Sequence, residues 1–323
     1  MIKQVLLVMF FASAVVNAQT ITTKTFGNGA NAFTMDFVTI GNPNNAADTT
    51  GSPNPAGSVA YTYNIGKYEV SRDMINKANA AGSLGISMID MTYFGGNGVN
   101  RAATGISWNE AARFVNYLNT SKGYQAAYNI TTSGANANIT LWAAGQYSGS
   151  NQFRHKDAYY VLPTEDEWYK AAYGSQDGAW YNFPNGSDSD PEAVLGGASG
   201  AVYGHGGIAS GPVDISNAGG LSAWGTMGQG GNVWEWNETA IDGVNNSADE
   251  TRTVRGGSWI NPSGYMSAWD RYGNYPVDDG DSGNVYASNL SLGFRVAIIP
   301  EPSALSLLAI GLGALAMMRR HCK

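Results

Sequence analysis

The chain has 323 residues and a formal net charge of −7, and this acidity argues against a nucleic-acid-binding protein, which needs a basic face to displace counterions from phosphates. A single cysteine excludes an internal disulfide bond, a thiolate zinc site and an iron–sulfur cluster. Hydrophobic residues make up 43% of the chain, enough for a substantial core, whereas the low charged fraction of 13% suits the neutral surface of an exported protein.

Both ends of the chain have the character of targeting segments. Residues 1–18 combine Lys3 with an apolar run and an ending in small residues, and this pattern predicts a secretory leader that is cut after Ala18. Residues 303–318 carry no charge and are followed by a basic end. They predict a short transmembrane helix of about 24 Å, with the flanking cations on the cytoplasmic side.

The body contains strand-like segments and one long irregular stretch. Residues 33–40 and 59–68 predict two strands separated by a loop rich in Gly, Pro and Asn. Residues 181–231 show hardly any periodic apolar pattern, so their backbone groups need another stabiliser. One cluster in this stretch offers the hard oxygens that calcium prefers, but a solvated acidic loop explains it equally well. The cluster consists of Asn185, Asp188, Asp190 and Glu192.

Three helices are predicted from their starting residues. Ser71 precedes one helical pattern. Ser107 with Glu110, and Thr164 with Glu167, form S/T-x-x-E capping boxes that open two more. Because capping accounts for these polar residues, we assign them a structural role.

The segment GGNVWEWNET, residues 230–239, is the most informative stretch. In an extended chain Trp234 and Trp236 point to one face and Glu235 to the other. A carboxylate held between tryptophans must find a cation or hydrogen-bond donors, because burying it unpaired is costly. That partner is either a calcium ion or an arginine such as Arg255 or Arg295. Further along, residues 252–259 predict a strand that runs into a Gly-Gly turn, and residues 292–299 predict a closing strand.

Six motifs occur in an order that resembles the formylglycine-generating enzyme family, also called sulfatase-modifying factor. They are EVSRDMINKAN, GISWNEAARFVNYLN, VLPTEDEWYKAAYG, GGNVWEWNE, RTVRGGSW and LGFRVA, and the resemblance as a whole spans residues 33–298. The resemblance implies an α+β fold of the C-type lectin-like kind: a single domain over residues 19–299 with little regular secondary structure.

The family also implies metal ions. One calcium is expected near the GN-W-EW motif, held by the carbonyls of Gly231 and Val233 and the side chain of Glu235. The family's usual Asn or Asp falls here on Gly228, which has no side chain.

The family's true enzymes oxidise a substrate cysteine at a copper ion held by two cysteines. Counted without gaps, those positions are Asn261 and Met266, which supply no thiolate, and the only cysteine, Cys322, lies beyond the predicted membrane helix. Because cuprous copper selects thiolates, we expect no copper.

The C-terminal tail, residues 300–323, resembles the PEP-CTERM sorting signal of Gram-negative bacteria. It consists of a Pro-Glu-Pro triplet, the apolar helix at residues 303–318 and a basic end. The resemblance implies export, transient anchoring in the inner membrane and cleavage by an exosortase. The destination would be the cell surface, the outer membrane or an extracellular matrix.

The leading hypothesis is a non-catalytic binding or scaffold module for exopolysaccharide or protein. The residues after the Gly-Gly turn are expected to line its ligand groove, although packing in a loop-rich core would explain them equally well. They are Trp259, Asn261, Tyr265, Met266, Trp269 and Arg271.

Two other classes stay open. One is a metal-dependent oxidoreductase of the formylglycine-generating or sulfoxide-synthase type that uses non-cysteine ligands, with Asp270, Arg271, Glu235 or His205 gathered in the groove. The other is a structural matrix component. His155 and His205 are interpreted as packing or surface residues, and the acidic run at residues 278–281 as a solvated turn.

Overall fold

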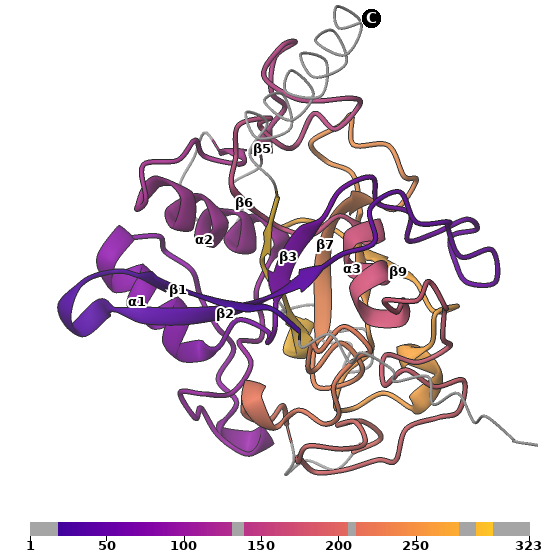
Figure 1. Ribbon diagram of the computed structural model, residues 1–323. Helices are drawn as coiled ribbons and strands as arrows, with labels where there is room; N and C mark the ends of the chain where they lie inside the picture. Colours follow the sequence, from indigo (N-terminus) through magenta and orange to yellow (C-terminus); the bar gives the residue numbers. More distant parts are fainter. Residues whose placement is uncertain (1–18, 131–138, 206–210, 278–288, 300–323) are drawn as a thin grey trace, which may run out of the picture.

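The computed structural model describes residues 19–130, 139–205, 211–277 and 289–299 (Figure 1). The predicted leader, the predicted tail and the acidic run at residues 278–281 lie outside these residues. Within the described ranges, no helix is both long and apolar enough to cross a membrane. The described residues form one mixed α+β domain with few helices, as the resemblance implied.

A five-stranded antiparallel sheet joins the two ends of the domain. Its strands, in spatial order, are β1 (Ile21–Phe26), β2 (Phe33–Ile40), β3 (Tyr63–Gly66), β11 (Ala297–Ile298) and β6 (Tyr160–Val161). The prediction of a strand at residues 33–40 is confirmed, whereas the second predicted strand is shorter than expected.

A second sheet of four strands is built from the C-terminal third of the chain. In spatial order it contains β10 (Leu292–Gly293), β7 (Trp234–Ala240), β8 (Arg252–Arg255) and β9 (Tyr272–Asn274). The pair β10 and β7 is parallel, and the other pairs are antiparallel. A separate two-stranded ladder joins β4 (Asn129–Ile130) to β5 (Ile139–Thr140).

All three predicted helices are present and begin at the predicted caps. They are α1 (Arg72–Gly82), α2 (Trp108–Thr120) and α3 (Glu165–Tyr173). Ser71 accepts a hydrogen bond from the backbone N–H of Met74, and α2 and α3 each carry a complete capping box. Short 3-10 turns occur at η1 (Gly29–Asn31), η2 (Thr92–Phe94), η3 (Ile215–Asn217), η4 (Ser263–Met266) and η5 (Asn289–Ser291).

The prediction of one closing strand at residues 292–299 is wrong. The segment divides into β10 and β11, which belong to different sheets. Phe294, Arg295 and Val296, which lie between β10 and β11, are all fully buried. The segment therefore lacks the alternation of buried and exposed side chains that is typical of a strand with one solvent-facing side. This crossing places the Arg295 side chain between the two sheets.

The irregular stretch at residues 181–231 contains only η3 as regular structure among its described residues. Backbone hydrogen bonds between separate loops satisfy it instead, for example from Val194 N–H to the Ala201 carbonyl at 2.9 Å. In the cluster considered for calcium, Asp188 accepts a bond from the Asn182 N–H and Asp190 one from the Ser263 hydroxyl. Local hydrogen bonding therefore accounts for both carboxylates.

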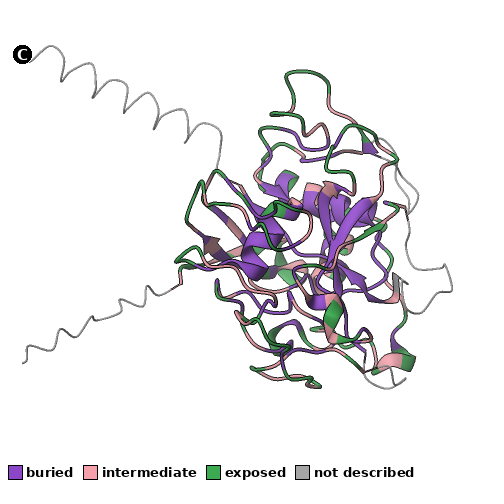
Figure 2. Ribbon diagram, turned by 90° about the vertical axis from the view of Figure 1, so that its right-hand side faces the viewer, coloured by how far each residue is buried: buried purple, intermediate pink, exposed green. Residues whose placement is uncertain are grey.

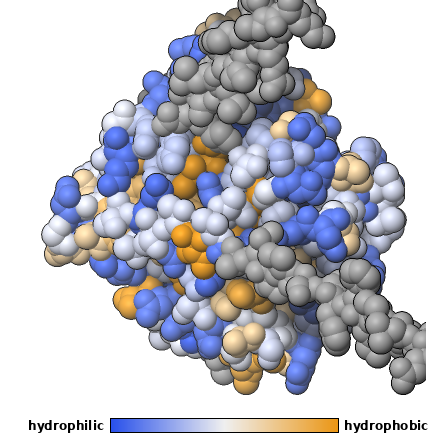
Figure 3. Space-filling model, in the orientation of Figure 1, coloured by the Kyte–Doolittle hydropathy of each residue, from blue (hydrophilic) through white to orange (hydrophobic). Residues whose placement is uncertain are grey.

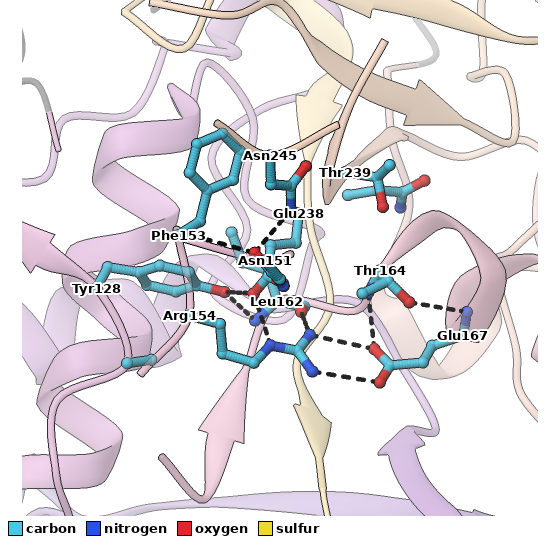
Figure 4. A network of polar contacts seen from close by, with 12 residues as sticks. Tyr128, Asn151, Phe153, Arg154, Leu162, Thr164, Glu167, Glu238, Thr239 and Asn245 are labelled. Carbon is cyan, nitrogen blue, oxygen red and sulfur yellow. Dashed lines mark hydrogen bonds and ion pairs between the residues drawn. The ribbon is translucent and has the colours of Figure 1, made fainter. Parts of the chain in front are cut away.

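Burial concentrates where the sheets and helices meet, and exposed residues lie mainly in the loops (Figure 2). The interior also holds charge. Arg154 donates to Glu238 at 2.9 Å and lies 3.3 Å from Glu167, and Tyr128 donates to the same Glu238 at 2.7 Å (Figure 4). Although burial opposes ionisation, Arg154 holds the pKa of Glu167 below its usual value. This network ties α3 to β7.

Candidate functional site

The four-stranded sheet presents two chemically different faces because side chains alternate along each strand. Glu235 of β7 pairs in register with Arg255 of β8, and both point toward α3, where Glu165 and Trp168 contact them. The opposite face carries apolar and aromatic residues. Leu292 pairs with Trp234 across β10 and β7, and Val254 pairs with Trp236 of β7 and with Tyr272 of β9.

This second face forms an aromatic pocket of about 190 Å³. Its lining consists of Trp234, Val254, Tyr265, Tyr272, Gly273, Asn274 and Leu292. The Tyr265 ring stacks on the Tyr272 ring at 5.7 Å, and the Trp234 ring meets the Tyr272 ring edge-on at 5.4 Å. A hydrogen bond between the two tyrosine hydroxyls, together with partial burial, raises the pKa of Tyr272. Tyr272 is 45% exposed, so one wall of the pocket faces solvent.

Glu235, expected as a calcium ligand, is fully buried and occupied by protein donors. Arg295 donates to both of its carboxylate oxygens at 2.5 Å, and the Trp168 indole N–H donates to one of them at 2.7 Å. The sequence left either a calcium ion or an arginine as the partner of Glu235, and in the structure the partner is Arg295. A calcium ion at Glu235 would compete with a guanidinium for the same oxygens. Together with the side-chain-free Gly228, this donor set does not fit calcium held by Gly231, Val233 and Glu235.

Arg271 belongs to the charged face and not to the pocket. Its guanidinium makes three hydrogen bonds of 2.8 to 3.0 Å to Glu165, which also pairs with Arg255 at 2.7 Å. Residues 271 and 272 lie next to each other in the chain, so their side chains point to opposite faces of the sheet. Arg271 therefore holds α3 to the sheet, whereas Tyr272 lines the pocket.

Comparisons with known proteins decide the family. The profile of the sulfatase-modifying factor enzyme 1-like domain matches residues 32–299. The chain belongs to this family. The mixed α+β domain with few helices described above is consistent with the fold of this family.

Solved structures support the same fold. A Treponema denticola variable protein 1 superposes with a TM-score of 0.60 at 23% identity, over 86% of this chain and 99% of that one. CarF superposes with a TM-score of 0.58 at 18% sequence identity, over 82% of this chain and 98% of CarF. PvdO from Pseudomonas aeruginosa superposes with a TM-score of 0.53 at 15% sequence identity, over 86% of this chain and 98% of PvdO. At these identities the likeness shows the fold alone. No curated protein sequence matches this chain.

The two positions at which the family resemblance places copper ligands are buried in this sulfatase-modifying factor-like domain. Asn261 accepts a hydrogen bond from the Ser258 hydroxyl at 2.6 Å, and Met266 packs with Phe183 and Ala201 in a small apolar cluster. An amide and a thioether do not fit a cuprous ion that selects thiolates.

The two tryptophans among the predicted groove residues lie in different environments. The Trp259 side chain is buried with Met91 and Val202, and Trp269 is 61% exposed. Of the six predicted groove residues, the pocket contains only Tyr265. The other five predicted groove residues lie outside this pocket.

Trp234 and Tyr272 line the pocket, yet neither was predicted as a ligand residue. The sequence placed Trp234 in the core, and it is indeed only 6% exposed. The juxtaposition of Tyr272 with Val254 depends on the pairing of β8 with β9, which local sequence does not specify. The usable signal was the density of aromatic residues between residues 265 and 275.

Proposed function

We propose that this chain is an exported, non-catalytic binding module that holds a saccharide in its aromatic pocket. The observation that carries the proposal is the composition of the pocket lining. Among the described lining residues, three aromatic rings, one amide and aliphatic groups are present, and the tyrosine hydroxyls are the only titratable groups. Such a surface suits stacking and hydrogen bonding, whereas acid–base or nucleophilic chemistry needs groups that titrate nearer neutral pH.

The size of the pocket limits the ligand. Pockets for drug-sized molecules run to ~300–1,000 Å³, and 190 Å³ is smaller, so the pocket holds one ring of a longer chain. An apolar sugar face would stack on Tyr272, and the Asn274 amide at the rim would hydrogen-bond to hydroxyls. An exopolysaccharide supplies such rings in repeating units.

The alternative, an oxidoreductase with non-cysteine metal ligands, finds less support. Of the four residues suggested for it, Glu235 and Arg271 are occupied by other ion pairs, and the His205 ring nitrogen lies 2.8 Å from the Val194 carbonyl oxygen. Burial raises the pKa of Asp270 to about 6, although Arg255 opposes the shift. The described residues contain no group of three or more His, Cys, Asp or Glu side chains that would hold a metal ion.

The proposed location follows from the ends of the chain. In this proposal the predicted leader at residues 1–18 directs export, the predicted helix at residues 303–318 anchors the protein transiently, and an exosortase-type enzyme removes the tail. The low charged fraction of 13% suits this destination. On the face shown in Figure 3, apolar residues form small separate patches among hydrophilic ones.

Titration of the purified full chain with neutral oligosaccharides, followed by tryptophan fluorescence, tests the proposed function. We expect saturable binding that Tyr272→Ala weakens roughly tenfold, because the substitution removes the stacking wall. Tyr93→Ala is the matched control, since Tyr93 is 65% exposed and does not line the pocket. Equal affinities for the wild type and Tyr272→Ala would contradict the proposal. Binding of peptides alone would assign the pocket to a protein ligand instead.

A further inference from the structure

A polar cleft with a volume of about 880 Å³ lies apart from the aromatic pocket. It lies where the turn between β1 and β2 meets the C-terminal ends of α1 and α2. Figure 1 shows these elements on the opposite side of the view from β9. We call this cavity the helix-end cleft. None of its lining residues is shared with the aromatic pocket.

Several polar side chains in the helix-end cleft have unused hydrogen-bonding capacity. Asn28 and Asn31 on the β1–β2 turn, and Ser83 after α1, make no side-chain hydrogen bond within the described part of the chain. Amides and hydroxyls with this freedom are the groups that pair with sugar hydroxyls. A volume within the usual ~300–1,000 Å³ range for ligands, combined with this polar lining, favours an oligosaccharide over an apolar compound.

An aromatic ring forms part of the cleft wall. Tyr117 of α2 is partly buried against the end of α1, where Gly82 leaves room for it. A Cβ at Gly82 would lie 2.8 Å from a Tyr117 ring carbon and 2.9 Å from Leu84. The absence of a side chain at Gly82 therefore leaves the space that the Tyr117 ring occupies, and the ring offers a stacking surface.

The charge of the cleft contrasts with that of the whole chain. The chain carries −7, yet the cleft is lined by Lys122 and Arg113 and by no carboxylate. Glu110 lies outside the lining and 3.8 Å from Arg113, so it offsets the charge of that guanidinium. Lys122 forms no ion pair with a described residue, and its ammonium lies 5.7 Å from the Phe26 ring centroid. One cation is thus left to face a ligand anion.

We propose that the helix-end cleft binds an acidic oligosaccharide, with a uronate-type carboxylate on Lys122. The hydroxyls of the sugar pair with Asn28, Asn31 and Ser83, and one ring lies against Tyr117. This site goes beyond the proposed function and does not depend on it, because the two cavities share no residue.

Calorimetric titration of the full chain with an oligogalacturonate tests the cleft. We expect saturable binding that Lys122→Gln weakens roughly tenfold, because a charge-assisted hydrogen bond is lost. Asn31→Ala should weaken it several-fold. Gly82→Ala should also weaken it while preserving the fold, because alanine favours the helix but displaces the Tyr117 ring.

The controls separate this site from other sources of binding. Lys156→Gln removes an exposed lysine outside the cleft, and Tyr272→Ala disables the aromatic pocket; neither should change the affinity for the oligogalacturonate. The methyl-esterified, uncharged oligomer should bind at least several-fold more weakly. Equal affinity for the charged and uncharged oligomers, no effect of Lys122→Gln, or binding of inorganic phosphate but not of the oligomer would each overturn the proposal.

Discussion

Replacing Arg154 with methionine is expected to destabilise the domain by about 3–5 kcal/mol, the cost of removing one partner from a buried ion pair. Arg154 is the shared cation for Glu167 and Glu238, whose side chains are at most 1% exposed (Figure 4). Methionine keeps most of the volume but removes the guanidinium that pairs with both buried carboxylates. Denaturant unfolding of the purified variant measures the loss.

Lys77→Met is the matched control for that experiment. Lys77 pairs with Asp73 at 2.7 Å on the surface of α1, with both side chains about one-third exposed. An exposed pair of this kind contributes ~0–1 kcal/mol. If Arg154→Met cost no more than Lys77→Met, the buried network would not hold α3 to β7 as described.

The second large effect concerns Glu69, whose burial gives the domain a pH-dependent stability. Glu69 is 1% exposed, and only one of its carboxylate oxygens accepts a hydrogen bond from a described residue, from Asn232 at 2.9 Å. Burial and the neighbouring charge of Glu235 raise its pKa from 4.5 to about 8, although Arg295 opposes the shift.

The sign of the effect follows from linkage. Below pH 4.5 the Glu69 carboxyl is protonated in both the folded and the unfolded chain, so its titration does not change the free energy of unfolding. Between pH 4.5 and 8 the unfolded chain releases it while the folded chain retains it, so stability falls by up to about 1.4 kcal/mol per pH unit. Glu69→Gln removes this titration. We expect the variant to match the wild type near pH 5 and to be more stable near pH 8.

Two controls accompany the pH profile. Glu192→Gln changes an exposed acid in the same way and should leave the profile of the wild type unchanged. A calcium chelator should also leave the profile unchanged, because Arg295 already supplies the positive charge at Glu235. A chelator that lowers stability would show that calcium binds beside these carboxylates after all, and would restore the expectation drawn from the family.

Local signals in the sequence predicted the parts of the fold that depend on neighbouring residues. The Ser107 and Thr164 capping boxes begin helices because their hydrogen bonds span only three residues. The Gly256 and Gly257 turn was also predictable, since both adopt positive φ, which glycine tolerates without strain.

Partners far apart in the chain were not predictable in the same way. Glu235 had two candidate arginines, and only the crossing between β10 and β11 shows that Arg295 is the one. Of the predicted groove residues, Tyr265 lines the aromatic pocket, whereas Arg271 pairs with Glu165 on the opposite, charged face of the sheet. Local sequence does not specify the strand pairing that separates them. The aromatic pocket therefore required the three-dimensional arrangement.

The most direct test of the central claim, that this family member binds and does not oxidise, is an assay for formylglycine. The full chain is incubated with cuprous ion, oxygen and a sulfatase-type cysteine peptide, and the product is followed by mass spectrometry. With an amide at Asn261 and a thioether at Met266, we expect no formylglycine beyond that formed by copper alone. Formylglycine produced over several turnovers per protein molecule would contradict the account.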